Sequence, residues 1–228
     1  MFKCETHMHV GEVSRCAKIS AREMIEIYKA RGYTTVFCTD HLAANNFPGM
    51  DESSWEEKVN YFCRGYENAR AAGEELGVTV LFGAEINFAG CPNHYLLYGI
   101  TRELLLNTPH IFEMSLEELY AYSRENGFTI VQAHPFRDGR NYPTPRVIDA
   151  FEVCNTNPRH NDHDELARAV ASVYGKPTTA GSDAHRTDDA ALGGVLTEEK
   201  ITTVEDYIRL LLNGELIFIG EENDISDK

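Results

Sequence analysis

The sequence predicts an α/β protein with a mostly parallel sheet, and three observations indicate this fold class. Short apolar runs with many β-branched residues alternate with longer stretches of helical periodicity. Most of the short runs end in a polar or ionisable residue. Glycines follow the helical stretches where C-caps are expected. The length of 228 residues and the apolar fraction of 43% fit a single domain over 1–228, with a core that needs no disulfides.

Each element has its own signal in the sequence. The expected strands cover 2–6, 34–39, 78–86, 95–100, 128–133, 150–153, 178–181 and 217–219. Capping boxes predict helices that begin after Ser20, with Glu23 in the first turn, and after Ser115, with Glu118 in the first turn. Glycines at positions 32, 77, 127, 175 and 214 are expected to end five helices. Exposed segments are expected at 138–146 and at the acidic end, 221–228, which should fray.

The composition argues against several classes of protein. The chain has 21 Lys and Arg against 36 Asp and Glu, a net charge of −15, so we expect no binding to long duplex nucleic acid. Six scattered cysteines without a C-x-x-C pair indicate a reducing cytoplasm rather than a disulfide scaffold. The first residues lack the features of a signal peptide, and no run is long enough to cross a bilayer, so no membrane partner is expected.

Six of the nine histidines lie at or beside the ends of the expected strands. They are His7, His9, His41, His94, His134 and His185. In an extended chain, His7 and His9 point to the same face and can reach one ion. A single histidine of this kind is more often structural, but six at the strand ends favour a shared site. Three carboxylates join the pattern, namely Asp40, Glu85 and Asp183. Mixed imidazole and carboxylate ligands suit Zn²⁺, Mn²⁺ or Fe²⁺ better than Ca²⁺ or Mg²⁺, although Asp40 fits a helix cap or a solvated strand end equally well.

The motifs THMH, TDH, GAEIN, AHPFR, EVCN and GSDAH, in this order, resemble the polymerase and histidinol phosphatase (PHP) superfamily. The resemblance extends from Glu5 to about Leu196. It implies a distorted, seven-stranded (β/α) barrel, similar to a TIM barrel, whose C-terminal strand ends hold two or three divalent metals. The residue pattern by itself indicates only the mostly parallel α/β domain.

The resemblance also implies a set of metal ligands. His7, His9, Glu85 and Asp183 are similar to the ligands of a first metal in the family. Glu85 would bridge to a second metal held by His134 and His94, and His41 and His185 would bind a third. The chain departs from the family after the H-x-H strand, where it reads VGEVSRCAKIS. Glu12 is the expected substitute ligand there, and Cys16 is the less favoured one.

The expected function is metal-dependent hydrolysis of phosphoesters, with metal-bound hydroxide attacking phosphorus in a small phosphomonoester, as in histidinol phosphatase. Asp183, His41 and His185 are the expected catalytic residues, and either histidine could protonate the leaving oxygen if the third metal is absent. One alternative is a phosphodiesterase or exonuclease acting on short nucleic acids or nucleoside bisphosphates. The other is a catalytically silent metal-binding regulatory module.

Three arginines near the motifs are candidates for binding the phosphate, because a guanidinium group pairs with phosphate through two hydrogen bonds. Arg137 in HPFR and Arg186 in DAHR are the first choices, and Arg159 in NPRH follows them. A surface salt bridge is the alternative role for each. The chain has no P-loop, no Rossmann glycine motif and no G-x-S-x-G motif, so nucleotide-binding folds of those types and serine hydrolases are not supported.

Overall fold

The computed structural model describes residues 1–220, and the expected fraying of 221–228 lies outside them. The strands are β1 (Phe2–Glu5), β2 (Tyr33–Cys38), β3 (His41–Leu42), β4 (Thr79–Asn87), β5 (His94–Tyr98), β6 (Thr129–Ala133), β7 (Ala150–Asn155), β8 (Thr178–Gly181), β9 (Gly194–Thr197) and β10 (Ile217–Ile219). The α-helices are α1 (Ala21–Ala30), α2 (Trp55–Leu76), α3 (Arg102–Leu106), α4 (Leu116–Asn126), α5 (Asp164–Tyr174) and α6 (Val204–Asn213). Short 3-10 turns are η1 (Ala44–Asn46), η2 (Ile111–Glu113) and η3 (Arg137–Gly139).

The strands form one mixed sheet that is mostly parallel, as the sequence predicts. Its order is β10-β9-β1-β2-β4-β5-β6-β7-β8, and β3 pairs with β4. The neighbours β1 and β2, β2 and β4, β6 and β7, and β7 and β8 are parallel. Strand β5 is antiparallel to both of its neighbours, and β9 is antiparallel to β1 and β10. Antiparallel β5 brings its first residue, His94, to the edge where β4 and β6 end, because it pairs with Asn87 and Ala133.

The sheet curls into a nearly closed barrel because the segment after β1 meets the segment after β8. The Thr6 hydroxyl donates to the carbonyl of Ala180 over 2.7 Å, and Met8 forms a parallel bridge with Ala184. Gly181 permits this approach, since a Cβ at that position would lie 2.6 Å from the Cβ of His7. The expected fold class, a distorted TIM-like α/β barrel, is therefore confirmed.

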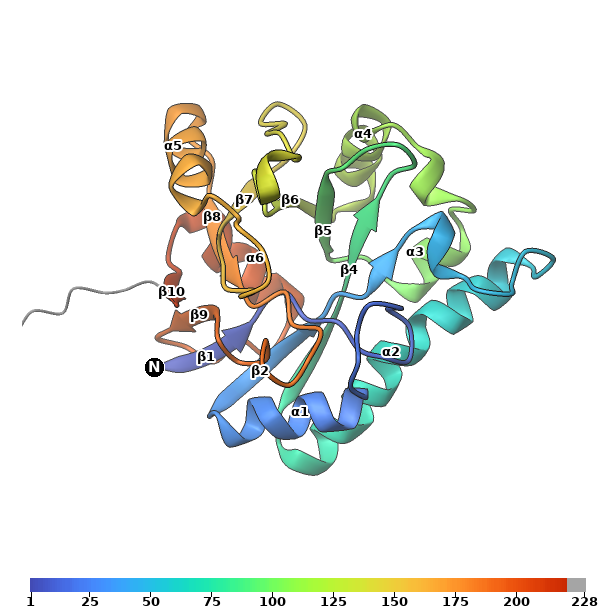
Figure 1. The fold of residues 1–228 in the computed structure, drawn as a ribbon, viewed down its shortest axis with the longest axis horizontal. Helices are drawn as coiled ribbons and strands as arrows, with labels where there is room; N and C mark the ends of the chain where they lie inside the picture. Colours follow the sequence, from blue (N-terminus) through green and yellow to red (C-terminus); the bar gives the residue numbers. More distant parts are fainter. Residues whose placement is uncertain (221–228) are drawn as a thin grey trace, which may run out of the picture.

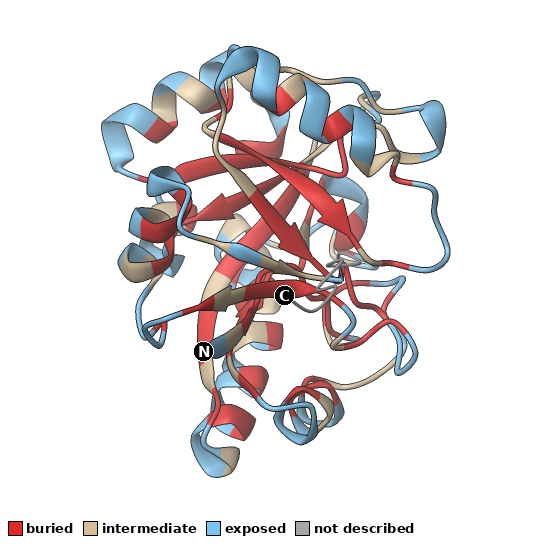
Figure 2. Cartoon of the chain, turned by 90° about the vertical axis from the view of Figure 1, so that its left-hand side faces the viewer, coloured by how far each residue is buried: buried red, intermediate tan, exposed pale blue. Residues whose placement is uncertain are grey.

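The strands are buried and the helices cover them, with their outer faces exposed to solvent (Figure 2). Helices α1 and α2 lie together on one side of the sheet (Figure 1). Helix α6 packs its buried side chains against inward-facing strand residues, and the ring of Tyr207 lies 4.9 Å from Phe37 and 4.8 Å from Tyr98. The barrel interior below the strand ends is thus filled by side chains, which leaves the C-terminal rim as the place for a polar site.

The two capping boxes and four of the five glycine C-caps that the sequence predicts are confirmed. Ser20 and Ser115 form capping boxes with Glu23 and Glu118. Glycines 77, 127, 175 and 214 are left-handed C-caps, whereas α1 ends one residue earlier, at Arg31. Strands β3 and β9 were not expected. No helix within 1–220 combines the length and the apolar character needed to cross a membrane.

Candidate metal centre

The six histidines that the sequence singled out, and two of the three carboxylates, come together at one rim of the barrel. They reach it from the C-terminal ends of parallel strands or, for His94, from the start of antiparallel β5. The residues of this cluster, which we term the rim cluster, are His7, His9, His41, Glu85, His94, His134, Asp183 and His185. His134 and Asp183 have positive φ values of 28° and 49°, and non-glycine residues adopt this region at a cost in energy. The strand-to-loop turns after β6 and β8 are therefore strained where they present these two side chains.

Glu85 lies at the centre of the rim cluster and is fully buried. Its Oε1 lies 3.0 Å from His94 Nδ1, 3.0 Å from His134 Nε2 and 3.4 Å from His7 Nε2. Its Oε2 lies 2.7 Å from His41 Nδ1 and 3.6 Å from His9 Nε2. One carboxylate thus faces five imidazole rings, which is the position of a bridging ligand between ions.

Asp183 forms the second carboxylate of the rim cluster. Its Oδ1 lies 3.2 Å from His9 Nε2 and 3.4 Å from His7 Nε2. Its Oδ2 lies 2.6 Å from Nη1 of Arg137. Burial raises the pKa of Asp183, but Arg137 and His7 outweigh it, so the pKa stays well below its usual value. Asp183 is therefore ionised and available as an anionic ligand at neutral pH.

Glu85 is ionised for the same reason. Burial raises its pKa, but the nearby rings of His94, His41 and His7 outweigh that effect and hold the pKa well below the usual value. His9 is neutral rather than charged. Burial and the positive charge on His41 and His185 hold its pKa well below the usual value, because both disfavour the protonated ring. The ring of His9 is therefore neutral and can donate a lone pair to a metal.

Contacts behind the rim cluster set the tautomers of the first two histidines. Nδ1 of His7 lies 2.9 Å from Oε1 of Glu152, and Nδ1 of His9 lies 3.3 Å from the hydroxyl of Ser14. Because a carboxylate can only accept, Nδ1 of His7 donates the hydrogen bond, which leaves Nε2 as the nitrogen that would bind a metal once its proton is displaced. Burial lowers the pKa of His7, but the carboxylates of Asp183, Glu152 and Glu85 outweigh it and raise the pKa well above its usual value. Nε2 of His7 and Nε2 of His9 are buried and have no hydrogen-bond partner within residues 1–220.

These residues fit divalent metal ions. Four overlapping groups place one ligand atom from each of three residues within 4.8 Å of one another. The groups are His7, His9 and Glu85; His7, His134 and Asp183; His41, Glu85 and His94; and His9, His41 and His185. Buried nitrogen atoms without hydrogen bonds are costly unless a ligand satisfies them, and a metal ion is the ligand that suits neutral imidazole and carboxylate together.

The structure corrects the expectation for Glu12, which it does not bring to the rim cluster. Both carboxylate oxygens of Glu12 accept the backbone N–H of Ala21 over 3.0 Å, at the start of α1. Cys16, the less favoured substitute, lies at the rim instead, with its Sγ 3.1 Å from Nε2 of His41. Burial raises the pKa of Cys16, but hydrogen bonds to His185 and His41 outweigh it and bring the pKa to about 6.

The three predicted phosphate-binding arginines lie in different surroundings. Arg137 forms ion pairs with two carboxylates. Its Nε lies 2.7 Å from Oδ1 of Asp162, and its Nη1 lies 2.6 Å from Oδ2 of Asp183. Arg159 pairs with Asp189 over 2.7 Å, and Asp189 accepts the backbone N–H of His185. Arg186 is exposed to solvent. Arg137 and Arg159 therefore help to hold rim residues in place, while Arg186 stays free in the direction of solvent.

Several buried residues that support the rim cluster were missed by sequence reasoning. Glu152 contacts His7 and also accepts the backbone N–H of His134 over 3.0 Å. Glu5 accepts the N–H groups of His7 and Ser182 over 2.8 and 2.9 Å, which ties the end of β1 to the end of β8. Asp40, which the sequence pattern grouped with Glu85 and Asp183, is buried outside the rim cluster, where it accepts the N–H of Val10 and the hydroxyl of Ser14. Acidic residues within short, mostly buried strands were the available signal for Glu5 and Glu152.

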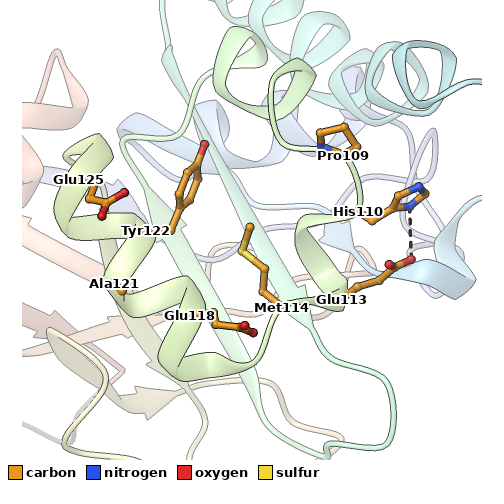
Figure 3. Close-up of a pocket in the computed structure, with 8 residues that line it drawn as sticks. All are labelled: Pro109, His110, Glu113, Met114, Glu118, Ala121, Tyr122 and Glu125. Atoms are coloured by element: carbon orange, nitrogen blue, oxygen red, sulfur yellow. Dashed lines mark ion pairs between the residues drawn. The ribbon is translucent and has the colours of Figure 1, made fainter.

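A pocket of about 490 Å³ opens beside the rim cluster. It is lined by Arg15, Cys16, His41, Ala43, Asn45, Asn46, Asn87 and His94. The loop after the TDH motif supplies Ala43, Asn45 and Asn46. A hollow of about 590 Å³ between η2 and α4 is separate, and none of the predicted site residues lines it (Figure 3).

Comparisons with known proteins show a similar fold and one matching family model. Residues 161–216 match the model of the PHP-associated family. No curated protein shows significant similarity to the chain. A two-domain protein of Bacteroides vulgatus, containing a predicted PHP-like metal-dependent phosphoesterase, superposes with a TM-score of 0.71 at 15% identity and covers 95% of this chain. This chain spans 64% of that protein, which is less than two thirds of its length.

Two further solved structures share the fold. PsfC from Pseudomonas syringae has a TM-score of 0.68 at 20% identity, over 97% of this chain and 93% of its own. The lesion-specific endonuclease PfuEndoQ from Pyrococcus furiosus has a TM-score of 0.63 at 16% identity, over 93% of this chain and 56% of its own. The chain therefore shares the fold of a protein containing a predicted PHP-like metal-dependent phosphoesterase, and residues 161–216 match the PHP-associated family model, in line with the resemblance of its motifs.

Proposed function

We propose that the chain is a metal-dependent phosphoesterase that acts as a phosphatase on small phosphomonoesters. The observation that carries the proposal is the rim cluster, in which Glu85 and Asp183 face buried imidazole nitrogens that have no hydrogen-bond partner within 1–220. A protein with a net charge of −15 needs a local source of positive charge to bind phosphate, and bound cations would provide it.

The rim cluster offers ligands for two or three divalent ions. His7, His9, Glu85 and Asp183 would hold the first, and Glu85, His94 and His134 would hold the second. His41 and His185 would take part in a third. When bound, such ions neutralise the charge of a phosphate and make water a stronger nucleophile at neutral pH.

The residues of the chain have separate tasks in this reaction. Glu152 and Ser14 hold the rings of His7 and His9 in the orientation that points Nε2 into the rim cluster. Burial lowers the pKa of His41, but the carboxylate of Glu85 and Cys16 outweigh it and raise the pKa well above its usual value. Because His41 also lines the pocket, it can deliver a proton to a leaving oxygen there if the third ion is absent.

The pocket supports a small phosphorylated substrate as the partner. Its volume of about 490 Å³ is in the range of small-molecule sites. Arg15 places a guanidinium group on its wall, with Nη1 donating to the carbonyl of Asn45. Long duplex nucleic acid does not suit the acidic surface, and we propose neither a duplex nor a membrane as a partner.

A phosphodiesterase acting on short nucleic acids or nucleoside bisphosphates is the second candidate. The structural similarity to the P. furiosus protein favours it, because that protein is a lesion-specific endonuclease. The same cluster of imidazoles and carboxylates would serve both reactions.

One experiment tests the proposal and separates the two candidates. Metal content is measured on protein purified without chelators, and the same preparation is assayed with p-nitrophenyl phosphate and with bis-p-nitrophenyl phosphate. Turnover of the monoester supports the phosphatase, and preference for the bis-ester supports the second candidate. Bound metal without turnover of either ester, or a His7→Ala variant as active as the wild type, would contradict both.

A further inference from the structure

The strongest unexplained feature lies at the outer side of the rim cluster, where two imidazole nitrogens face each other beside a thiol. Nε2 of His41 lies 3.4 Å from Nε2 of His185 and 3.1 Å from Sγ of Cys16. Nδ1 of His185 lies 2.8 Å from the carbonyl of Asp183, and Nδ1 of His41 lies 2.7 Å from Glu85. Both oxygens are acceptors, so both Nδ1 atoms donate, and the two Nε2 atoms face each other as the positions left for one shared proton or for a cation.

Two lone pairs this close repel each other unless a proton or a cation lies between them. His9 adds a further nitrogen that can bind a cation, because one ring nitrogen of each of His9, His41 and His185 lies within 4.8 Å of the other two. Nε2 of His9 is fully buried and has no hydrogen-bond partner within the described residues. One proton can bridge His41 and His185 but leaves Nε2 of His9 without a partner, whereas a shared cation would bind all three nitrogen atoms.

We propose that Cys16 is a thiolate ligand of the ion held by His41 and His185, and that its sulfur selects Zn²⁺ or Fe²⁺ over harder ions at this position. The inference rests on the proposed metal centre and adds to it a ligand and a metal preference. Thiolate favours softer ions, whereas Mn²⁺ and Mg²⁺ prefer oxygen. Binding removes the thiol proton to solvent, so the sulfur contributes a full negative charge.

The backbone around Cys16 supports this role. The N–H of Lys18 donates to the carbonyl of His185 over 2.8 Å, and the N–H of Ala17 donates to the carbonyl of Ser14. These bonds hold the segment carrying Cys16 against the loop that carries His185. Cys16 also lines the pocket, so an ion at this position is open to substrate from one side. Glu12 cannot compete for it, because its carboxylate is used at the start of α1.

Cobalt replacement tests the proposal on the full chain. Co²⁺ bound by a thiolate gives a charge-transfer band in the near ultraviolet, which imidazole and carboxylate ligands do not give. We expect this band in the wild type and in the control variants Cys91→Ser and Glu12→Gln. We expect its loss in Cys16→Ser, which should keep the visible absorption of cobalt at the other ligands. Circular dichroism establishes that each variant is folded.

The outcomes separate the new ligand from the proposed function. Cobalt bound to the wild type without the band, or a band that persists in Cys16→Ser, would overturn the role of Cys16 and leave the metal centre standing. A wild type that binds no cobalt would overturn both. As a second readout, Zn²⁺ should lower the rate at which iodoacetamide alkylates Cys16 and leave the rate at Cys91 unchanged. An equal rate at Cys16 with and without bound Zn²⁺ would contradict the proposal.

Discussion

At the scale of one residue, the buried carboxylate of Glu152 orients the expected metal ligand His7 without being a ligand itself. It fixes Nδ1 of His7 and accepts the N–H of His134, so two ligands depend on it. We expect Glu152→Gln to weaken metal binding or activity by about 10- to 100-fold, since an amide can fix the wrong tautomer of His7. Metal titration by calorimetry measures the effect, with the exposed Glu165→Gln as control. Equal affinity in both variants would show that Glu152 is not required.

Arg137 connects Asp183 to Asp162 and has a further nitrogen, Nη2, that is buried without a hydrogen bond within 1–220. Lysine keeps the charge but cannot contact both carboxylates with the same planar geometry. We therefore expect Arg137→Lys to lower kcat or raise KM for the preferred phosphoester by about tenfold or more. Arg186→Lys, a change at an exposed position, is the matched control in the same assay. Unchanged kinetics in Arg137→Lys would remove Arg137 from the site.

At the scale of an element, helix α5 begins with Asp164, and the surroundings of this carboxyl group disfavour its ionised form. Burial, together with the charges of Asp162 and Glu152, raises the pKa of Asp164 to about 7. A carboxyl group with a higher pKa in the folded state than in the unfolded state binds more protons when folded. Its contribution to stability is therefore present below the unfolded value of about 3.9 and is lost as the pH rises through 7.

We expect Asp164→Asn to remove this part of the pH dependence. The wild type should lose stability relative to the variant between about pH 4 and 7, so the difference in unfolding free energy favours the variant most at pH 8. Urea denaturation at several pH values measures this difference. Glu165→Gln controls for loss of a negative charge in the first turn of the same helix. A constant difference between wild type and Asp164→Asn across the pH range would contradict the prediction.

The elements also show which parts of the fold and site were predictable. Capping boxes and left-handed glycines are local, so α1 and α4 were found from the sequence. Strand β3 has only two residues and forms by pairing with β4, which no local pattern reveals. The motif histidines were placed at the rim because strand ends of a parallel sheet share one edge. Glu12 was expected ahead of Cys16, whereas the structure places Cys16 beside His41, because the outcome depends on how the chain turns between β1 and α1.

At the scale of the whole molecule, the rim cluster joins the two ends of the barrel wall. His7 and His9 follow β1, whereas Asp183 and His185 follow β8, and 174 residues separate Thr6 from Ala180 across that seam. Any ion held by His9 and Asp183 would therefore connect the first and last parallel strands of the sheet. Metal binding and the stability of the barrel are expected to be coupled for this reason.

Removal of metal should accordingly lower the stability of the whole fold rather than of one loop. An ion that binds only the folded state stabilises it by about 2.7 kcal/mol at a free concentration 100 times its Kd. We expect Tm to fall when EDTA is added and to recover with Zn²⁺. His9→Ala, which removes a ligand at the seam, should make Tm insensitive to EDTA or greatly reduce its response. His160→Ala, outside the rim cluster, should respond as the wild type does. Differential scanning calorimetry measures each value, and an EDTA-independent Tm in a metal-containing wild type would show that metal binding and barrel closure are not coupled.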